Sequence, residues 1–186
     1  MSRTRLASVF IPLVVASAGA AFAAAPASGA APELSQSLSE LHEVSQWSVA
    51  LSEMADARAK SDLVKNYARS IVNANPGLDA KIVAVAQKKG VDVAAPDTQT
   101  DEGKSVSERM KAEAAFLGTL QGDAFDKEYM TLVTNTQQSV LNLLKANKAS
   151  AKEPEVKQLM GELTTTIQGR LKTAQEIMSK VYGNQI

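Results

Sequence analysis

The fold is decided by a stretch that reads LSELHEVSQWSVALSEMA, residues 38–55. Apolar side chains return in this stretch every three or four positions, and they are Leu38, Leu41, Val44, Leu51 and Ala55. Such spacing places them on one face of an α-helix, because an α-helix turns once in about 3.6 residues. The stretch therefore predicts an amphipathic helix, over about residues 34–58, that buries this face against neighbouring helices.

The same period continues outward to the end of the chain, and no segment alternates for long enough to predict a strand. Residues that start and stop helices divide it into four more elements. Their expected ranges are about 61–88, 104–119, 123–147 and 154–183. Four long amphipathic helices are typical of an antiparallel four-helix bundle. We therefore expect an all-α fold, with the helix over 104–119 as one additional short helix.

Single residues predict how the second helix is shaped. Ser61 is a favoured N-cap, and Gly90 stands where a glycine commonly ends a helix. Pro76 lies inside the helix and cannot donate to the Val72 carbonyl oxygen, so we expect a kink or a restart there. Asn75 would then cap the second half of the helix.

The first residues predict where the protein works. Arg3 and Arg5 precede an apolar run over 6–16, and small residues follow it. This order is typical of a secretory signal peptide, and the run is shorter than the roughly 20 residues that span a membrane. Cleavage after Ala23 fits the rule for small residues at the cleavage site.

These boundaries predict three parts of the chain. They are a signal peptide over 1–23, a flexible leader over 24–33 and a helical bundle domain over 34–183. The mature chain is then periplasmic or secreted, and it contains no transmembrane span.

Composition narrows the classes of function. The chain has no cysteine, so in an oxidising compartment its stability comes from packing and not from disulfides. Removing residues 1–23 takes away two of the 20 Lys and Arg residues and none of the 20 Asp and Glu residues, which leaves a formal charge of −2. Such a chain lacks the basic surface that nucleic-acid binding needs, so we expect no nucleic acid as a partner.

Polar residues interrupt the apolar faces near the middle of the long helices. They are Ser48, Asn75, Asn135 and Arg170. Antiparallel helices of similar length bring their midpoints to one level, so we expect a polar layer at mid-height. In four-helix bundles metal and cofactor sites are built at such a level. Two amides, a hydroxyl and a guanidinium nevertheless make a poor metal site, because metals need carboxylate, imidazole or thiolate donors.

Several segments resemble the domain-of-unknown-function 4142 family, a branch of the ferritin-like bundles found in exported bacterial proteins. The matching segments are LHEVSQ at 41–46, VKNYA at 64–68, AQKKGV at 86–91, GDAFDKEY at 122–129 and RLKTA at 170–174. The Gly-x-x-Phe-Asp-x-x-Tyr pattern within 122–129 is the most distinctive. The resemblance covers about residues 38–178 and implies a ferritin-like helical bundle.

The departures from the family pattern carry as much information as the matches. The resemblance implies a Glu in the first helix, Asp-His pairs in the second and third long helices, and a His in the last. At those positions this sequence has Ser48, Ala74-Asn75, Thr134-Asn135 and Arg170. The ligand set that the family implies is thus lost from every long helix, and we expect neither a metal nor another cofactor.

Other chemically active side chains have plain explanations. His42 is the only histidine, with no second imidazole or thiol to assist it, and we interpret it as partly exposed or satisfied by the core. Arg170 either binds an anion in a central cavity or sends its head group to solvent or to a carboxylate, and we favour the second. Asp123 is expected to cap the helix over 123–147, and Asp126 is interpreted with it as helix-start chemistry.

The sequence contains no glycine-rich phosphate loop, no nucleophile elbow and no Cys–His arrangement, so we expect that the protein is not an enzyme. Our leading hypothesis is an exported, non-catalytic bundle for binding, scaffolding or envelope stress, with an unknown protein or small ligand as its partner. One alternative is a ferritin-like metal-dependent oxidoreductase or metal-storage protein. Another is a carrier of a small ligand or anion that uses a cavity around Asn75, Asn135 and Arg170.

Overall fold

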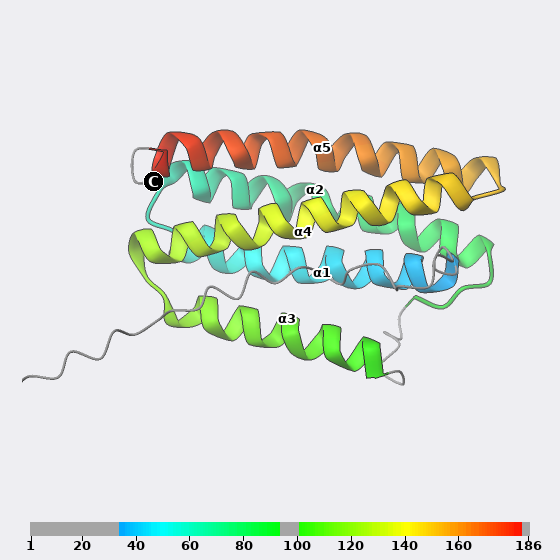
Figure 1. The fold of residues 1–186 in the computed structure, drawn as a ribbon, viewed down its shortest axis with the longest axis horizontal. Helices are drawn as coiled ribbons and strands as arrows, with labels where there is room; N and C mark the ends of the chain where they lie inside the picture. Colours follow the sequence, from blue (N-terminus) through cyan, green and yellow to red (C-terminus); the bar gives the residue numbers. More distant parts are fainter. Residues whose placement is uncertain (1–33, 94–100, 184–186) are drawn as a thin grey trace, which may run out of the picture.

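The computed structural model describes residues 34–93 and 101–183, and every regular element in these ranges is an α-helix (Figure 1). The helices are α1 (Leu34–Arg58), α2 (Asp62–Lys88), α3 (Asp101–Thr119), α4 (Gly122–Ser150) and α5 (Pro154–Tyr182). The expected all-α fold is confirmed. The predicted signal peptide and leader lie outside the described residues. No helix within the described ranges has both the length and the apolar character needed to cross a membrane.

Four long helices lie side by side, and α3 runs along the outside of this bundle next to α1 (Figure 1). α1 packs against α2, and α4 packs against α5, each pair joined by a short connection. Contacts of α1 with α4 and of α2 with α5 close the ring. Each helix of the ring runs antiparallel to its neighbours (Figure 1), so residues near the helix midpoints lie at one level.

The core consists of two clusters of buried side chains, one toward each end of the bundle. Leu51 and Phe125 belong to the cluster near the α1–α2 connection, and Leu38 and Val156 belong to the other. Trp47 is partly buried and packs against both clusters, so it marks the level at which they meet. The apolar packing is therefore interrupted at mid-height.

α2 passes through Pro76 without a break, which corrects the expected restart. Proline removes the hydrogen bond to the Val72 carbonyl oxygen, but α1 and α5 both pack along α2 and hold the helix across the gap. Asn75 does not cap a second segment, because its side-chain Nδ2 donates to the Ser45 carbonyl oxygen on α1 at 3.0 Å. The glycine predicted at the end of α2 is confirmed, since Gly90 has a φ of 69°.

The start of α4 also differs from expectation. Gln121 is the N-cap and Asp123 lies in the first turn, so Asp123 is not the cap. Asp126 serves a different helix: its buried carboxylate accepts from the backbone N–H groups of Lys60 at 2.9 Å and Ser61 at 2.7 Å. These groups lie just before α2, where helical N–H groups lack partners within the helix. Asp126 therefore fixes the α1–α2 connection against α4.

Candidate functional site

A cavity of about 60 Å³ lies at mid-height, where the two core clusters meet. A buried water needs roughly 10–15 Å³ of such space, so the cavity has room for about four to six waters or for one small organic molecule. Its polar wall is made by Ser45, Ser48, Asn75, Thr136, Gln137 and Arg170. Trp47 and aliphatic side chains of the four long helices make up the rest of the wall.

Arg170 on α5 belongs to the wall of this cavity. Nη1 donates to Asn75 Oδ1 on α2 at 2.5 Å, while Nη2 is buried without a hydrogen-bond partner among the described residues. Burial lowers the pKa of the guanidinium, and the nearby Tyr67 and Tyr129 oppose this; arginine nevertheless stays charged at neutral pH. The interpretation that we favoured for Arg170, a head group in solvent or on a carboxylate, is therefore corrected.

Asn75 holds Arg170 in place. The side chain of Asn75 is 4% exposed. Its Nδ2 donates to the Ser45 carbonyl oxygen on α1, and its Oδ1 accepts from Arg170 on α5, so one amide links three helices. Because both ends of this amide are engaged, Asn75 positions the guanidinium of Arg170.

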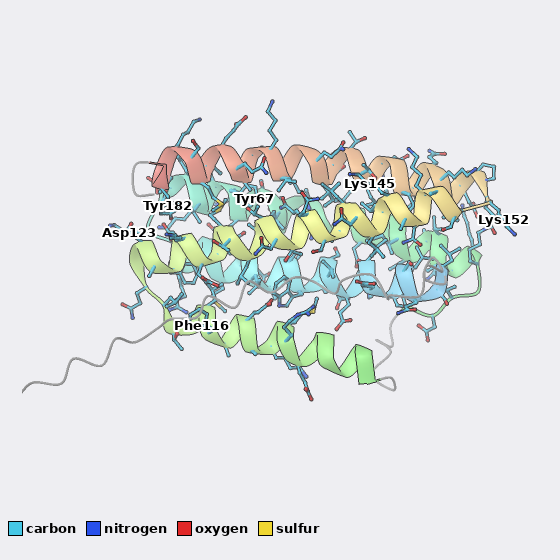
Figure 2. All side chains as sticks on the ribbon, in the orientation of Figure 1. Tyr67, Phe116, Asp123, Lys145, Lys152 and Tyr182 are labelled. Atoms are coloured by element: carbon cyan, nitrogen blue, oxygen red, sulfur yellow. The ribbon has the colours of Figure 1, made fainter. Side chains whose placement is uncertain are left out.

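α4 adds two polar residues to the cavity wall that are not among the four predicted members of the polar layer. Gln137 is 6% exposed and Thr136 is 4% exposed. Gln137 Nε2 donates to the Tyr67 hydroxyl, which donates to the Arg170 carbonyl oxygen at 3.4 Å. Burial raises the pKa of Tyr67, so this hydroxyl keeps its proton. Gln137 Oε1 and Thr136 Oγ1 are buried and have no hydrogen-bond partner in the described ranges. Figure 2 shows Tyr67 among the side chains between the long helices.

The structure brings three members of the predicted polar layer, Ser48, Asn75 and Arg170, to the cavity wall. The fourth, Asn135, is half-buried and does not belong to that wall. A helix advances about 100° per residue, so on α4 the inward direction falls on the next two residues and not on Asn135.

The inward position of Gln137 follows from its spacing to apolar residues along α4. Gln137 lies four residues after Val133 and three before Val140, and both of these aliphatic residues line the cavity. A polar residue in this register belongs to the inward face by the same rule that identifies the apolar stripe. Asn135 is predicted from its nearness to the helix midpoint, but register around the helix is the stronger criterion.

The donor set at this level does not fit a metal ion. The cavity wall contains no Asp, Glu, His or Cys. Within the part of the chain that the structure describes, no group of three such residues could hold a metal. Arg170 places a fixed positive charge where the family pattern implies ligands, and Asn75 Oδ1 already bonds this charge. The layer is therefore suited to an anion.

His42 lies on α1 and is not part of the cavity wall. Its Nδ1 donates to Asp79 Oδ1 on α2 at 2.8 Å, and its Nε2 accepts from Gln46 Nε2 at 2.9 Å. Nδ1 thus joins α1 to α2, and Nε2 makes a contact within α1. This arrangement agrees with the interpretation of His42 as a satisfied, partly exposed histidine.

Trp47 connects the cavity wall to α3. The indole lines the cavity, and its Nε1 donates to the Met110 carbonyl oxygen at 3.3 Å. Three glutamates on the same two helices have raised pKa values, chiefly because of burial: Glu40 and Glu43 on α1, and Glu113 on α3. The docking of α3 therefore supports one side of the wall and brings acidic side chains out of water.

Comparison with known proteins supports this fold. The model of a family described as a domain of unknown function, DUF4142, matches residues 19–177. A solved structure of a DUF305 protein from Streptomyces coelicolor, whose name includes the words "secreted protein", is similar to this chain with a TM-score of 0.64 at 14% identity. The match covers 78% of this chain and 91% of that chain, and at such identity it indicates the fold alone. No curated protein matches the chain.

Proposed function

This chain belongs to the DUF4142 family, and from that premise we propose that it is an exported, non-catalytic binding protein whose mid-height cavity holds a small anion. Binding is the part of our leading hypothesis that the geometry supports, since the cavity has a defined volume and a charged wall. The proposal also takes up the alternative of an anion carrier, with Gln137 and Thr136 in place of Asn135.

The observation that carries the proposal is the guanidinium of Arg170, which is the only charged group among the residues of the cavity wall. Its Nη2 is buried without a hydrogen-bond partner in the described ranges. A buried polar group without a partner costs about 1–3 kcal/mol, and a charged one costs more. An anion in the cavity would neutralise the guanidinium, whose charge no carboxylate of the cavity wall balances.

The non-catalytic part of the proposal rests on the chemistry of the wall. Ser45, Ser48 and Thr136 are its only hydroxyl side chains, and the wall offers no imidazole or carboxylate to act as their general base. His42, the one histidine of the sequence, is engaged on both ring nitrogens outside the wall. The wall therefore suits binding better than bond cleavage.

Export is supported by the order of charged, apolar and small residues at the start of the chain. The name of the structurally similar DUF305 protein points the same way. An exported binding protein without cysteines relies on packing and internal hydrogen bonds for its stability.

Thermal unfolding with sodium salts of formate, acetate, propionate and nitrate tests the proposal. A ligand at about 100 times its Kd adds about 2.7 kcal/mol, which corresponds to a rise of roughly 5–10 °C in Tm for a domain of this size. We expect such a rise with at least one carboxylate, and none with Arg170→Met.

Arg69→Met is the matched control, because Arg69 is an exposed arginine that pairs with Asp56 at 2.7 Å. It should keep the ligand-induced rise. The proposal is contradicted if no salt raises the Tm of the wild type beyond a sodium chloride reference, or if Arg170→Met shows the same rise.

A further inference from the structure

We infer that α3 is a cover that controls access to the mid-height cavity, and that Trp47 closes the cavity only while α3 is docked on the ring. The inference goes beyond the proposed function, because it concerns access to the cavity and holds whichever molecule the cavity binds. It comes from the position of α3, from the contact between Trp47 and Met110, and from the buried charges under α3.

α3 lies outside the ring, over the seam between α1 and α4. It packs against α4 and runs next to α1 (Figure 1). The described residues of the cavity wall come from the four ring helices α1, α2, α4 and α5. The cavity can therefore keep its four helices when α3 moves.

Trp47 joins the cavity to α3. Its indole lines the cavity, and its Nε1 donates to the Met110 carbonyl oxygen on α3 at 3.3 Å. A buried indole N–H normally keeps a hydrogen-bond partner, so the position of the ring system depends on that of α3. When α3 leaves, the indole loses this bond and can turn out of the cavity wall.

The apolar attachment of α3 is small. In its described range the large buried apolar side chains are Met110 and Leu117, whereas Phe116 is 50% exposed. Figure 2 shows Phe116 on α3, outside the ring. A helix with few buried apolar contacts can open locally while the rest of the protein stays folded.

Charged side chains of three helices act on one another where α3 docks. They are Glu40 and Glu43 on α1, Arg109, Lys111 and Glu113 on α3, and Glu128 on α4. Both carboxylate oxygens of Glu113 are buried without a hydrogen bond from the described residues, and Arg109 Nε is 4.0 Å from Oε1. Burial raises the pKa of Glu113 although Arg109 acts to lower it, so docking disfavours the ionised carboxylate. An ionised Glu113 therefore favours release of α3.

The end of α3 that joins α4 is held more firmly. Arg58 on α1 donates to the carbonyl oxygens of Gly118 at 3.0 Å and Leu120 at 2.8 Å. Its guanidinium also lies over the Phe125 ring, 5.1 Å from the ring centre. We therefore expect this end to act as the hinge and the contact at Met110 to open first.

A single introduced thiol reports the opening, because the chain has no cysteine of its own. Thr136→Cys places a thiol on the cavity wall at a side chain that is 4% exposed, and Val64→Cys places one in the core outside the wall. The test measures the rate at which methyl methanethiosulfonate labels each thiol, divided by the rate for the same thiol in the urea-unfolded protein. We expect Thr136→Cys to react faster than Val64→Cys, because release of α3 exposes the cavity without global unfolding.

Two further changes in α3 should move the labelling rate of Thr136→Cys in opposite directions. Met110→Ala removes a buried side chain and should raise the rate at least about 10-fold. Glu113→Gln imitates the protonated carboxyl and should lower the rate by about 3-fold or more at neutral pH. Leu63→Ala and Glu108→Gln are the matched controls at exposed positions, and they should leave the rate within about 2-fold.

Equal rates for Thr136→Cys and Val64→Cys would overturn the inference, because the cavity would then open only with the whole fold. A Thr136→Cys rate that Met110→Ala leaves unchanged would also overturn it, as would an equal acceleration of Val64→Cys in that variant. Should Thr136→Cys not fold, Ser48→Cys on the same wall replaces it.

The role of Trp47 has its own readout. Met110→Ala should increase the quenching of Trp47 fluorescence by acrylamide together with the labelling rate, because the indole loses its cover. Faster labelling with unchanged quenching would overturn the role of Trp47.

Discussion

Asp126 and Arg170 are both charged side chains inside the bundle, but they differ in how completely they are hydrogen-bonded. Both oxygens of Asp126 accept from backbone N–H groups, of Lys60 and of Ser61, and the side chain is 0% exposed. Arg170 pairs one terminal nitrogen with Asn75 and keeps the other buried without a described partner. Each oxygen of Asp126 thus has a hydrogen-bond partner within the fold, whereas one terminal nitrogen of Arg170 has none among the described residues. The difference shows which of the two charged groups the fold leaves without full hydrogen bonding.

The surroundings of the two groups explain this difference. Asp126 lies where the α1–α2 connection leaves N–H groups that need acceptors, so its oxygens find fixed partners within the chain. Arg170 belongs to the wall of a cavity between two core clusters, and its second nitrogen is buried without a hydrogen-bond partner among the described residues. A buried charge that only stabilises a fold is normally fully bonded. We therefore interpret Asp126 as structural and Arg170 as functional.

The largest expected effect belongs to Asp126→Ala. The change removes two hydrogen bonds to a charged group and leaves two backbone N–H groups unpaired, so we expect the free energy of unfolding to fall by about 3–5 kcal/mol. This corresponds to a Tm lower by roughly 6–20 °C for a domain of this size. Thermal and denaturant unfolding followed by circular dichroism measure the loss.

Asp123→Ala is its control. Asp123 is exposed (Figure 2) and pairs with Lys60 Nζ at 2.7 Å, and an exposed ion pair contributes less than about 1 kcal/mol. Similar small losses in both variants would contradict the structural role of Asp126.

The next expected effect separates stability from binding at Arg170. Arg170→Met leaves Asn75 Oδ1 unpaired, which lowers the free energy of unfolding. It also removes a guanidinium from the interior, which raises that free energy. We expect the free energy of unfolding to change by no more than about 1.5 kcal/mol, while the rise in Tm with carboxylate salts is lost. A loss of stability as large as that of Asp126→Ala would show that Arg170 is structural, and would remove the contrast between the two charges.

A smaller effect concerns the pH dependence of α3 docking. Burial raises the pKa values of Glu40, Glu43 and Glu113 above their ordinary value of 4.5. The folded state therefore holds these protons to higher pH than the unfolded state does, so their contribution to stability is present below pH 4.5 and is lost as pH rises through the raised values. We expect α3 to be held more tightly in mildly acidic solution than at neutral pH.

Trp47 reports this change, because it is the only tryptophan and bonds to α3 through the Met110 carbonyl oxygen. Acrylamide should quench its fluorescence less at mildly acidic pH than at pH 7, in buffers without carboxylates. Glu113→Gln removes one of the three titrating groups and should reduce the difference. An increase in quenching on acidification would contradict the sign derived from burial.

The smallest expected effect belongs to Asn135→Ala. Asn135 is half-buried on α4 and does not line the cavity. We expect the free energy of unfolding to change by less than about 0.5 kcal/mol, and the rise in Tm with carboxylate salts to stay the same. A clear loss of that rise in this variant would place Asn135 at the site after all.

The helices were predictable because their signal repeats along the whole element. One apolar stripe, for example, contains Leu38, Leu41 and Val44, and a single polar residue within such a stripe does not change its helical period. The family-model match confirms the resemblance to DUF4142 that short segments indicated. Pro76 misled the prediction because proline acts on the local backbone, whereas the packing of α1 and α5 that carries α2 across it is tertiary.

The site was predictable only in part. Asn75 and Arg170 stand out because each is polar on an apolar stripe, but their bond to each other depends on how α2 and α5 are placed. Asp126 looked like local helix chemistry, and its partners lie more than sixty positions earlier in the chain. Gln137 was overlooked although its register with Val140 was visible, so register around the helix deserves more weight than height along it.

The central claim is that the guanidinium of Arg170 binds a small anion in the mid-height cavity. A crystal structure of the protein grown with sodium acetate tests it most directly. The account predicts electron density for a carboxylate beside the Arg170 guanidinium, within the cavity between the two core clusters. An Arg170 head group that pairs with a protein carboxylate, or a cavity filled by side chains while acetate binds elsewhere, would contradict it.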